Sequence, residues 1–515
     1  MMKPWNSLIT TKRLRKICQA AFLLVFLFLF VQTENKGSES MGYPIRLFLD
    51  FDPLLLITTM ISSHAVPAAL FLSLATIVLT LVFGRVFCGW ICPLGTLNNA
   101  ISTFSRSKKT GPGKLYRLKY YILFFIIAAA FSGIQLAGIL DPLSLFARSI
   151  TVNVYPFISS LFMSILDLIE KYAPEGAADI SGRIYSSLRG TVLPFNEVHF
   201  SQSMLIGGIF FIVLLLNIVE KRFWCRYLCP LGALLGLLSR FAPFGIKVSE
   251  GCASCGACSK PCQGGAVIDN GRARMKTECL VCMDCDDPCP NEAVQYGIIM
   301  KNIPLDVKRR GVIFSLVAGI FTVPFFRQRP AVKDPSLIRP PGSVKESVFS
   351  NRCIKCGACL KVCPTGGLQP LLLEAGFQGI WTPRLVPLIG SCEYCTLCGQ
   401  VCPTGAILEM KKDKLMNIKI GEAMIDRSRC LPWADGEPCI VCEEMCIVPQ
   451  KAIWLEETKI KDMSGAEVSL LLPHVDTRRC IGCGKCEKNC PLDDRPAIFV
   501  TNTGESREEG LQGFL

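Results

Sequence analysis

The feature that most constrains this chain is a set of cysteines in runs of four with short, regular spacing. Four runs follow the pattern CxxCxxCxxxCP, in which three cysteines fall on one short loop. Three thiolates so close together suit a soft metal centre better than disulfides, which in small secreted scaffolds are more scattered. The runs are Cys279, Cys282, Cys285 and Cys289; Cys353, Cys356, Cys359 and Cys363; Cys392, Cys395, Cys398 and Cys402; Cys480, Cys483, Cys486 and Cys490.

Two further sets depart slightly from this pattern. Cys252, Cys255, Cys258 and Cys262 lack only the final proline, and Cys430, Cys439, Cys442 and Cys446 have the insertion LPWADGEP after the first cysteine. The spacing is that of bacterial ferredoxins, so the six sets predict about six [4Fe–4S] clusters. Structural zinc is the alternative, but zinc sites usually show paired CxxC motifs or histidines.

In paired ferredoxin runs the fourth cysteine ligates the partner cluster. We therefore expect Cys289 to join the cluster of Cys252 to Cys258, and Cys262 to join that of Cys279 to Cys285. The spacing does not decide whether the last four clusters pair as neighbours or first with last. Cys18 stands alone in an apolar run and is most simply a small apolar residue.

Half of the 515 residues are hydrophobic, and several apolar runs approach the length that crosses a bilayer. The basic residues flank these runs, so positive-inside topology explains the net charge of +13, and no nucleic-acid module is evident. A cleaved signal peptide is the alternative for the first run, but no A-x-A site follows it. The predicted spans are residues 17–33, 66–83, 120–140 and 204–219.

The loop of residues 84–119 carries seven basic and no acidic residues, which predicts a cytoplasmic loop and a cytoplasmic N-terminus. A fifth apolar segment, 311–326, follows Lys308, Arg309 and Arg310, and crossing there puts the rest of the chain outside. Residues 45–61 and 155–169 contain aspartates and suit interfacial or re-entrant helices.

The sequence thus predicts a mixed fold of an α-helical membrane domain, with about four or five spans, and α+β ferredoxin-like domains. The expected parts are a membrane domain (1–245), a cytoplasmic two-cluster ferredoxin domain (246–303), an anchor helix with a proline-rich linker (304–349), and an extracytoplasmic four-cluster polyferredoxin domain (350–515).

The membrane half contains an internal repeat. FDPLL at Phe51 reappears as LDPLS at Leu140, and RVFCGWICPLG from Arg85 reappears as RFWCRYLCPLG from Arg222. Two matches in the same order predict a duplicated two-helix unit with pseudo-twofold symmetry.

Each copy of the repeat carries a CxxxCP motif, with Cys88 and Cys92 in the first and Cys225 and Cys229 in the second. Cysteines four apart share one helix face, so symmetry can bring all four together. A tetrathiolate metal or cluster site is the sharper hypothesis, and a redox disulfide or a structural role are the alternatives.

Two of the three histidines, His64 and His199, precede the second and fourth predicted spans. A quinol that loses protons there needs a base that titrates near neutrality, which histidine supplies, although interfacial histidines without a role are common. No CxxCH, GxxxxGK[ST] or GxGxxG motif occurs, and no independent substrate chemistry is evident.

The first 300 residues resemble the membrane ferredoxins of the NapH and MauN type through FCGWICPLG, CRYLCPLG and the two ferredoxin runs that follow. The rest resembles the periplasmic NapG and MauM type through RPPGS at Arg339, NRCIKCGACLKVCPTG and CLPWADGEPCIVCEEMC. The family's exported half carries a twin-arginine signal, and KRRGVIFSLVAGIF occupies that place here without the usual serine or threonine.

This resemblance implies a fused component of a quinol dehydrogenase in a bacterial or archaeal cytoplasmic membrane. It would oxidise quinol and pass electrons through [4Fe–4S] clusters to a periplasmic reductase or cytochrome. A redox-sensing or maturation factor for a metalloenzyme is the alternative function. A subunit of an ion-translocating redox pump is less favoured, because buried charges in the spans are scarce.

Overall fold

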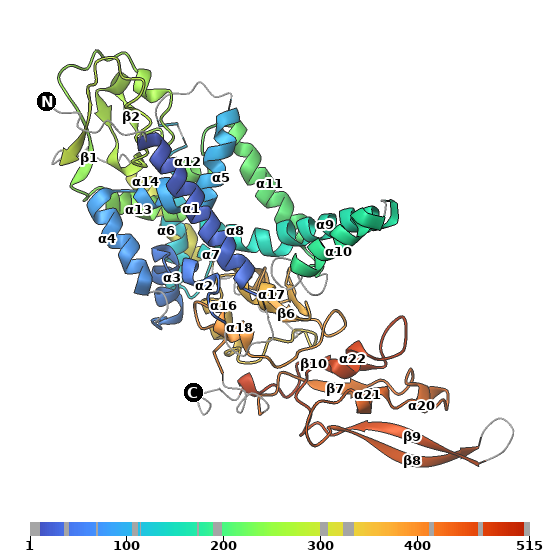
Figure 1. Ribbon diagram of the computed structural model, residues 1–515. Coiled ribbons are helices and arrows are strands. Elements are labelled where there is room, and N and C mark those ends of the chain that lie inside the picture. The colour runs from blue at the N-terminus through green and yellow to red at the C-terminus, as the bar shows by residue number, and fades with distance from the viewer. Residues whose placement is uncertain are drawn as a thin grey trace. The chain divides into compact units, whose positions relative to one another are not determined.

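The computed structural model divides the chain into two compact units. Unit 1 comprises Met1–Gln32, Tyr43–Ile150 and Met204–Phe326, and unit 2 comprises Thr33–Gly42, Thr151–Ser203 and Arg327–Leu515. Figure 1 shows their helices and strands. The structure describes residues 11–34, 41–67, 71–105, 112–113, 115–172, 175–188, 198–298, 307–322, 334–410, 417–461 and 467–508. The proline-rich linker up to residue 333 and the end of the predicted anchor segment lie outside these ranges.

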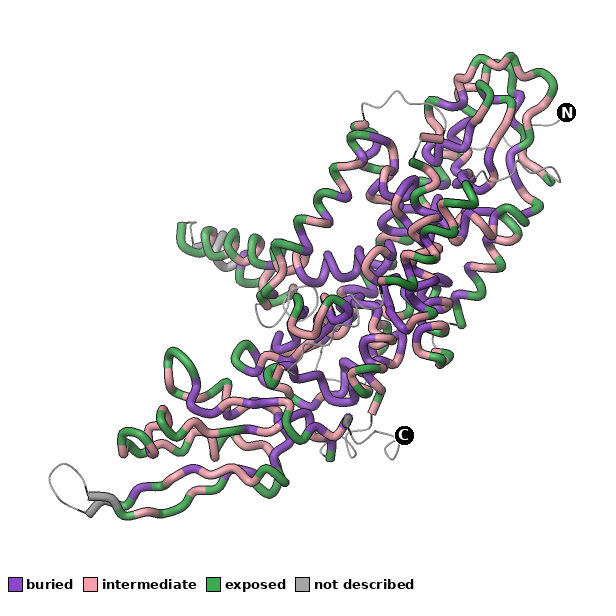
Figure 2. The backbone as a smooth tube through the Cα atoms, turned by 180° about the vertical axis from the view of Figure 1, so that it is seen from behind, coloured by how far each residue is buried: buried purple, intermediate pink, exposed green. Residues whose placement is uncertain are grey.

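Unit 1 is built mainly from helices. They are α1 (Thr11–Gln32), α2 (Arg46–Leu49), α3 (Pro53–Ser63), α4 (Ser73–Phe83), the π-helix η2 (Phe87–Ile91), α5 (Pro93–Ile101), α6 (Leu118–Phe131), α7 (Ala137–Leu140), α8 (Pro142–Ser149), α11 (Ser203–Val219), α12 (Phe223–Tyr227), α13 (Pro230–Ser239) and α14 (Arg309–Phe321). Figure 2 shows buried backbone concentrated where these helices pack together.

The internal repeat governs how four of these helices begin. Asp52 and Asp141 each accept a backbone hydrogen bond and cap α3 and α8, and a proline follows each of them at the first helical position. Cys92 and Cys229 cap α5 and α13 in the same way through their sulfurs. Proline suits this position because its missing N–H would be unpaired there in any case. The DP and CP dipeptides are therefore helix starts in both copies.

The helices differ in length from the predicted spans. Among the described residues two helical runs are long and apolar enough to cross a membrane, Thr11–Gln32 and Pro142–Tyr172. The first agrees with the predicted span 17–33, whereas the second includes residues 155–169, which the sequence suggested as interfacial. The apolar helices in the other predicted spans are α4, α6 and α11, each 17 residues or shorter. Four to five spans therefore remain an expectation.

Helix α6 stops short of its predicted end at residue 140. It ends at Phe131, and Gly133 follows with a φ of +75°, a left-handed conformation that terminates helices. Helix α14, at the predicted anchor segment, packs along α6. A Cβ at Gly311 would meet the ring of Tyr121, and one at Gly319 would lie 2.6 Å from the carbonyl oxygen of Phe125. The order of these contacts makes the two helices parallel.

The ferredoxin domain of unit 1 has two small antiparallel sheets. Strand β1 (Phe244–Val248) pairs with β4 (Val294–Ile298), and β2 (Val267–Ile268) pairs with β3 (Ala273–Arg274). Its core packs cysteine sulfurs against Ile246, Val267 and Val294. Cysteine side chains therefore form part of the small core of this domain.

Buried charges attach this domain to the helices. Glu278 is 1% exposed, pairs with Lys119 and with Arg85 at 3.5 Å, and accepts a 2.8 Å hydrogen bond from the hydroxyl of Tyr120. On α1, Arg15 pairs with Asp284 at 2.8 Å. Arg15 and Asp284 are also buried, so the domain is fixed on this end of the helices by desolvated ion pairs.

Unit 2 contains α9 (Tyr155–Tyr172), α10 (Glu175–Leu188), short helices and three two-stranded sheets. The remaining helices are α16 (Glu346–Arg352), α17 (Ala358–Val362), α18 (Leu397–Gln400), α20 (Leu431–Ala434), α21 (Val441–Glu444) and α22 (Lys485–Lys488). The sheets pair β5 (Leu368–Pro370) with β6 (Pro383–Leu385), β7 (Glu422–Ile425) with β10 (Ile498–Thr501), and β8 (Ile453–Lys461) with β9 (Glu467–Val475). The β8–β9 hairpin forms a long arm (Figure 1).

An Arg–Glu–Arg triad holds the start of the ferredoxin-like part of unit 2. Arg339, the arginine of RPPGS, pairs with Glu346 at 2.5 Å and donates a hydrogen bond of 2.6 Å to the carbonyl oxygen of Pro383. Arg507, near the other end of this part, pairs with the same carboxylate at 2.6 Å. Burial would raise the pKa of Glu346, but Arg339 and Arg507 outweigh it and lower this pKa to about 2. The triad therefore joins residues far apart in sequence.

We predict that Glu346→Gln destabilises unit 2 by about 2 kcal/mol at pH 7, a value reduced from that of a fully buried pair because the Glu346 side chain is 36% exposed. The folded pKa lies below the unfolded one, so this contribution is present above about pH 4.5 and is lost as the pH falls toward 2. Scanning calorimetry of the anaerobic protein at several pH values measures it, with exposed Glu409→Gln as the control. A difference between the variants that stays constant down to pH 2 would contradict the triad's role.

Candidate iron–sulfur sites

The ferredoxin domain of unit 1 brings its eight cysteines into two groups. Cys252, Cys255, Cys258 and Cys289 line one pocket. Cys262 interacts electrostatically with the other group, which is Cys279, Cys282 and Cys285. These are the groups that ferredoxin logic predicts, with the fourth cysteine of each run placed beside the first three of the other.

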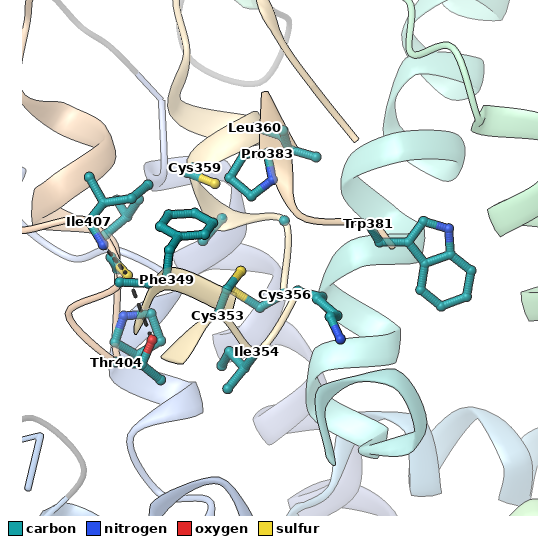
Figure 3. A pocket seen from close by; sticks show the side chains of 17 residues that line it. Phe349, Cys353, Ile354, Cys356, Cys359, Leu360, Trp381, Pro383, Thr404 and Ile407 are labelled. Carbon is teal, nitrogen blue, oxygen red and sulfur yellow. Dashed lines mark hydrogen bonds between the residues drawn. The ribbon is translucent and has the colours of Figure 1, made fainter. Parts of the chain in front are cut away.

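In unit 2, two further pairs of runs exchange their fourth cysteines in the same way. The first pocket there contains Cys353, Cys356, Cys359 and Cys402, and Figure 3 shows the labelled side chains around it. Cys363 interacts with Cys392, Cys395 and Cys398. A second pocket contains Cys430, Cys439, Cys442 and Cys490, and Cys446 interacts with Cys480 and Cys483. The last four sets are thus arranged as sequence neighbours, a choice that the spacing alone leaves open.

The insertion in the sixth set loops away from its cysteines. Residues 431–434 form α20, and the indole of Trp433 donates a hydrogen bond of 3.1 Å to the carbonyl oxygen of Pro473 on β9. The Trp433 ring also lies edge-on to His474, at 5.3 Å between centroids. The insertion is therefore packed against the β8–β9 arm, which leaves Cys430 free to lie beside Cys439 and Cys442.

The fourth cysteines have surroundings that suit thiolates. The backbone N–H groups of Ala266, Ala293, Ala452 and Ala497 donate to the sulfurs of Cys262, Cys289, Cys446 and Cys490, at 3.3 to 3.4 Å. Hydrogen bonds of this kind stabilise cluster ligands and tune their reduction potentials.

The free thiols themselves are strongly protonated. Burial raises the pKa of Cys353 and Cys483 to about 11 and that of Cys442 to about 12. Cluster binding must therefore deprotonate these ligands, as metal binding to thiols generally does.

The donor sets fit clusters better than single ions or disulfides. None of the 29 cysteines forms a disulfide. Within the described part of the chain, no group of three or more Cys, His, Asp or Glu side chains is arranged to hold one metal ion. Sets of four sulfurs around a pocket match a multi-iron cube, which when bound supplies a one-electron carrier.

The four CxxxCP cysteines also come together. Cys88, Cys92, Cys225 and Cys229 are each less than 10% exposed. Cys92 interacts electrostatically with Cys88 and Cys225, and Cys229 interacts with the other three. Both copies of the repeat thus contribute two thiols to one buried cluster of side chains.

The two histidines proposed for quinol are exposed. His64 is the C-cap of α3, in a left-handed conformation, and it belongs to unit 1. His199 belongs to unit 2, where its backbone carbonyl accepts a hydrogen bond from Gln369. Cys18 lies on α1, partly exposed.

The cysteine groups and the small two-stranded sheets define an iron–sulfur protein with several [4Fe–4S] sites. Comparison with protein families agrees. Families described as 4Fe-4S binding domains match residues 65–112, 200–249 and 398–421, and residues 472–495. A 4Fe-4S dicluster domain matches residues 352–406, which contain the first two cysteine runs of unit 2. No solved structure matches the chain.

The chain belongs to the ferredoxin-type electron-transfer proteins of the NapG and MauM kind. It is 36% identical to the ferredoxin-type protein NapG of Escherichia coli over 165 residues, which are 32% of this chain and 69% of NapG. The methylamine utilization ferredoxin-type protein MauM of Methylorubrum extorquens is 32% identical over 210 residues, 40% of this chain and 88% of MauM.

A third relative has a different coverage. The putative electron transport protein YccM of Escherichia coli is 29% identical over 238 residues, 44% of this chain. The match covers about half of that relative, 55% of its length.

We predict that Cys446→Ser exposes Cys480, Cys483 and Cys486 rather than its sequence neighbours Cys439 and Cys442. Loss of a ligand destabilises the cluster it serves, and the exchanged arrangement assigns Cys446 to the later run. Anaerobic alkylation of the intact protein with iodoacetamide, followed by mass spectrometry, identifies the exposed thiols. Cys490→Ser is the matched control and should expose Cys430, Cys439 and Cys442. Alkylation of each variant within its own run would contradict the exchange.

Proposed function

We propose that this protein is a membrane-bound component of a quinol dehydrogenase, which passes electrons through about six [4Fe–4S] clusters to an extracytoplasmic reductase or cytochrome. Quinol oxidation releases two electrons and two protons, and one-electron carriers in series are suited to accept the electrons one at a time. The alternative function is that of a redox-sensing or maturation factor.

The observation that carries this proposal is the contact between the ferredoxin domain of unit 1 and the helices. A Cβ at Gly89 would lie 2.3 Å from the carbonyl oxygen of Leu280, so the backbones of η2 and the ferredoxin loop touch. The indole of Trp90 donates a hydrogen bond of 3.0 Å to the carbonyl oxygen of Val281. Leu280 and Val281 lie between two cluster ligands, and clusters so placed can receive electrons from a donor in the membrane.

The packing of α14 supports an extracytoplasmic unit 2. Helices α6 and α14 are parallel, and both begin at basic residues, Lys119 and Arg309 respectively. The ferredoxin domain lies at the N-terminal end of α6, where Glu278 pairs with Lys119. If that end is cytoplasmic, as the positive-inside rule predicts, a chain that crosses with α14 continues on the other side.

The chain also joins features of two proteins. Residues 1–303 fit the NapH and MauN type through the CxxxCP repeats and the first ferredoxin runs, while the NapG and MauM relatives match about a third of the chain. We propose that a fusion links quinol oxidation and electron delivery in one polypeptide. His64 and His199 are the candidate acceptors of the quinol protons, because histidine is the residue type most often used as a proton acceptor at physiological pH.

We predict that a menaquinol analogue rapidly and completely reduces the clusters of the purified protein. The change in absorbance near 400 nm under anaerobic conditions measures the reduction, and its size should be on the order expected for several [4Fe–4S] centres. The oxidised quinone is the control. Absence of reduction in a protein with full iron content would favour the sensing or maturation role. Unchanged quinol oxidation in a His64→Gln/His199→Gln variant would exclude the histidines as proton acceptors.

We predict that external protease cleaves residues 350–515 in intact spheroplasts, because this segment follows α14 out of the membrane. Immunoblotting with an antibody against the C-terminus measures the cleavage, and the loop of residues 84–119 is the internal control that should stay intact. Protection of the C-terminal segment until the membrane is permeabilised would place it in the cytoplasm.

A further inference from the structure

Arg222 is a buried cation without a matching anion. Its side chain is fully buried, and its Nη1 donates a hydrogen bond of 3.0 Å to the carbonyl oxygen of Cys88. The other two guanidinium nitrogens, Nε and Nη2, have no hydrogen-bond partner. Among the described carboxylates, none forms an ion pair with Arg222. Burying a cation without a compensating anion costs free energy. A bound anion would therefore stabilise this site.

Arg85 holds the equivalent position in the other copy of the repeat. Each arginine precedes the first cysteine of its own motif by three residues. Each reaches the glycine of the opposite motif: Arg85 Nη2 would lie 2.9 Å from a Cβ at Gly232, and Arg222 Nη1 would lie 3.7 Å from a Cβ at Gly95. The two copies therefore exchange arginines, and the absence of a side chain at Gly232 leaves room for the guanidinium.

The four CxxxCP sulfurs are the groups these arginines face. Arg85 interacts electrostatically with Cys88 and Cys229, and Arg222 interacts with Cys88. The amide of Asn98 lies 3.6 Å from the sulfur of Cys225. Asn98 is itself fixed by Asn217, which donates to its side-chain oxygen at 2.8 Å.

Backbone donors complete the surroundings of the sulfurs. The N–H of Gly95 lies 3.4 Å from the sulfur of Cys92, and the N–H of Gly232 lies 3.2 Å from that of Cys229. Cationic and N–H groups thus surround four sulfurs from two chain segments. This is the environment of thiolate ligands rather than of neutral thiols packed as apolar residues.

We propose that Cys88, Cys92, Cys225 and Cys229 bind a further iron–sulfur cluster, and that Arg85 and Arg222 balance its negative charge. The inference rests on the proposed iron–sulfur function and adds a centre to it. Four thiolates carry more negative charge than an iron–sulfide core neutralises, so the bound cluster is the anion that Arg222 lacks.

The site lies directly against the first ferredoxin domain. Its η2 segment, between Cys88 and Cys92, contacts the loop of Leu280 and Val281. Arg85 also donates a hydrogen bond of 3.0 Å to the carbonyl oxygen of Thr277, two residues before Cys279. Arg85 therefore contacts both the CxxxCP site and the loop before Cys279. The additional cluster is the intermediate electron carrier between a membrane donor and the cluster of Cys279, Cys282 and Cys285.

The first test counts iron, acid-labile sulfide and electrons in the full-length anaerobic protein. Cys92→Ser/Cys229→Ser should lose two or four irons, the matching sulfide and one electron equivalent in coulometric titration, while Cys18→Ser, the control, loses none. Loss of one iron without sulfide would indicate a mononuclear site, and unchanged counts would show that these thiols hold no cluster. Either result overturns the proposal.

The second test keeps all the ligands. Arg222→Gln should retain the full iron content but shift the reduction equilibrium of one cluster at least tenfold toward the oxidised form, about 59 mV lower for one electron. Removing a positive charge disfavours adding an electron to an anion, so Arg222→Lys should restore most of the potential. Exposed Arg240→Gln is the control. An unchanged potential for every cluster in Arg222→Gln would contradict the proposal, even if the cysteine variant fails to fold.

These outcomes separate the two proposals. A purified chain without iron would refute the iron–sulfur function as a whole. A chain with its ferredoxin-type clusters, whose iron and potentials are insensitive to both variants, would refute only the additional centre.

Discussion

The structure depends on one constraint, which is that the fourth cysteine of each ferredoxin run lies with the first three of its partner. Cys289 lies with Cys252 to Cys258, and Cys402 lies with Cys353 to Cys359. Neither run can complete its site without the other. The described sheets beside the runs have two strands each, and an isolated two-stranded sheet is only marginally stable. Each pair of runs therefore brings its cysteines together as one unit.

In the helical half of unit 1 the corresponding constraint is electrostatic. Large charged side chains are fully or nearly fully buried there, among them Arg15, Arg85, Lys119 and Arg222. Lys119 and Arg85 converge on Glu278, and Arg15 pairs with Asp284. Such pairs contribute little net stability but are costly to break. They fix the position and orientation of the ferredoxin domain, because any other arrangement leaves several charges unpaired away from water.

The cysteine groups were the part of this molecule most predictable from sequence, because ligand spacing is set by the size of the centre rather than by the rest of the fold. Hydropathy was less informative. It counts apolar residues and so extended α6 to residue 140, whereas the Ser132-Gly133 pair ends the helix. Residues 155–169, which were expected to be interfacial because of Asp167, lie in a helical run that is long and apolar enough to cross a membrane, so that expectation stays a prediction.

Other features carried no local signal. The pairing of the last four cysteine sets depends on long-range contacts, and the spacing is the same for either arrangement. Arg85 and Arg222 were explained as basic residues flanking spans, but both are buried. Their equal distance from the cysteine in both repeats was the one signal that could have set them apart from the flanking lysines. The roles of Asn98 and Glu278 could not be inferred without the packing.

The exchange of arginines between the two CxxxCP segments has an evolutionary consequence. One copy of the repeat supplies two of the four sulfurs and an arginine that extends toward the other copy. By itself it therefore supplies only half of the four-cysteine site. An ancestor with a single copy would have needed a second, identical subunit to complete it across a twofold axis. Joining both halves in one polypeptide removes the dependence on concentration and allows each copy to change independently, as Gly89 in the first copy and Arg226 at the equivalent position of the second illustrate.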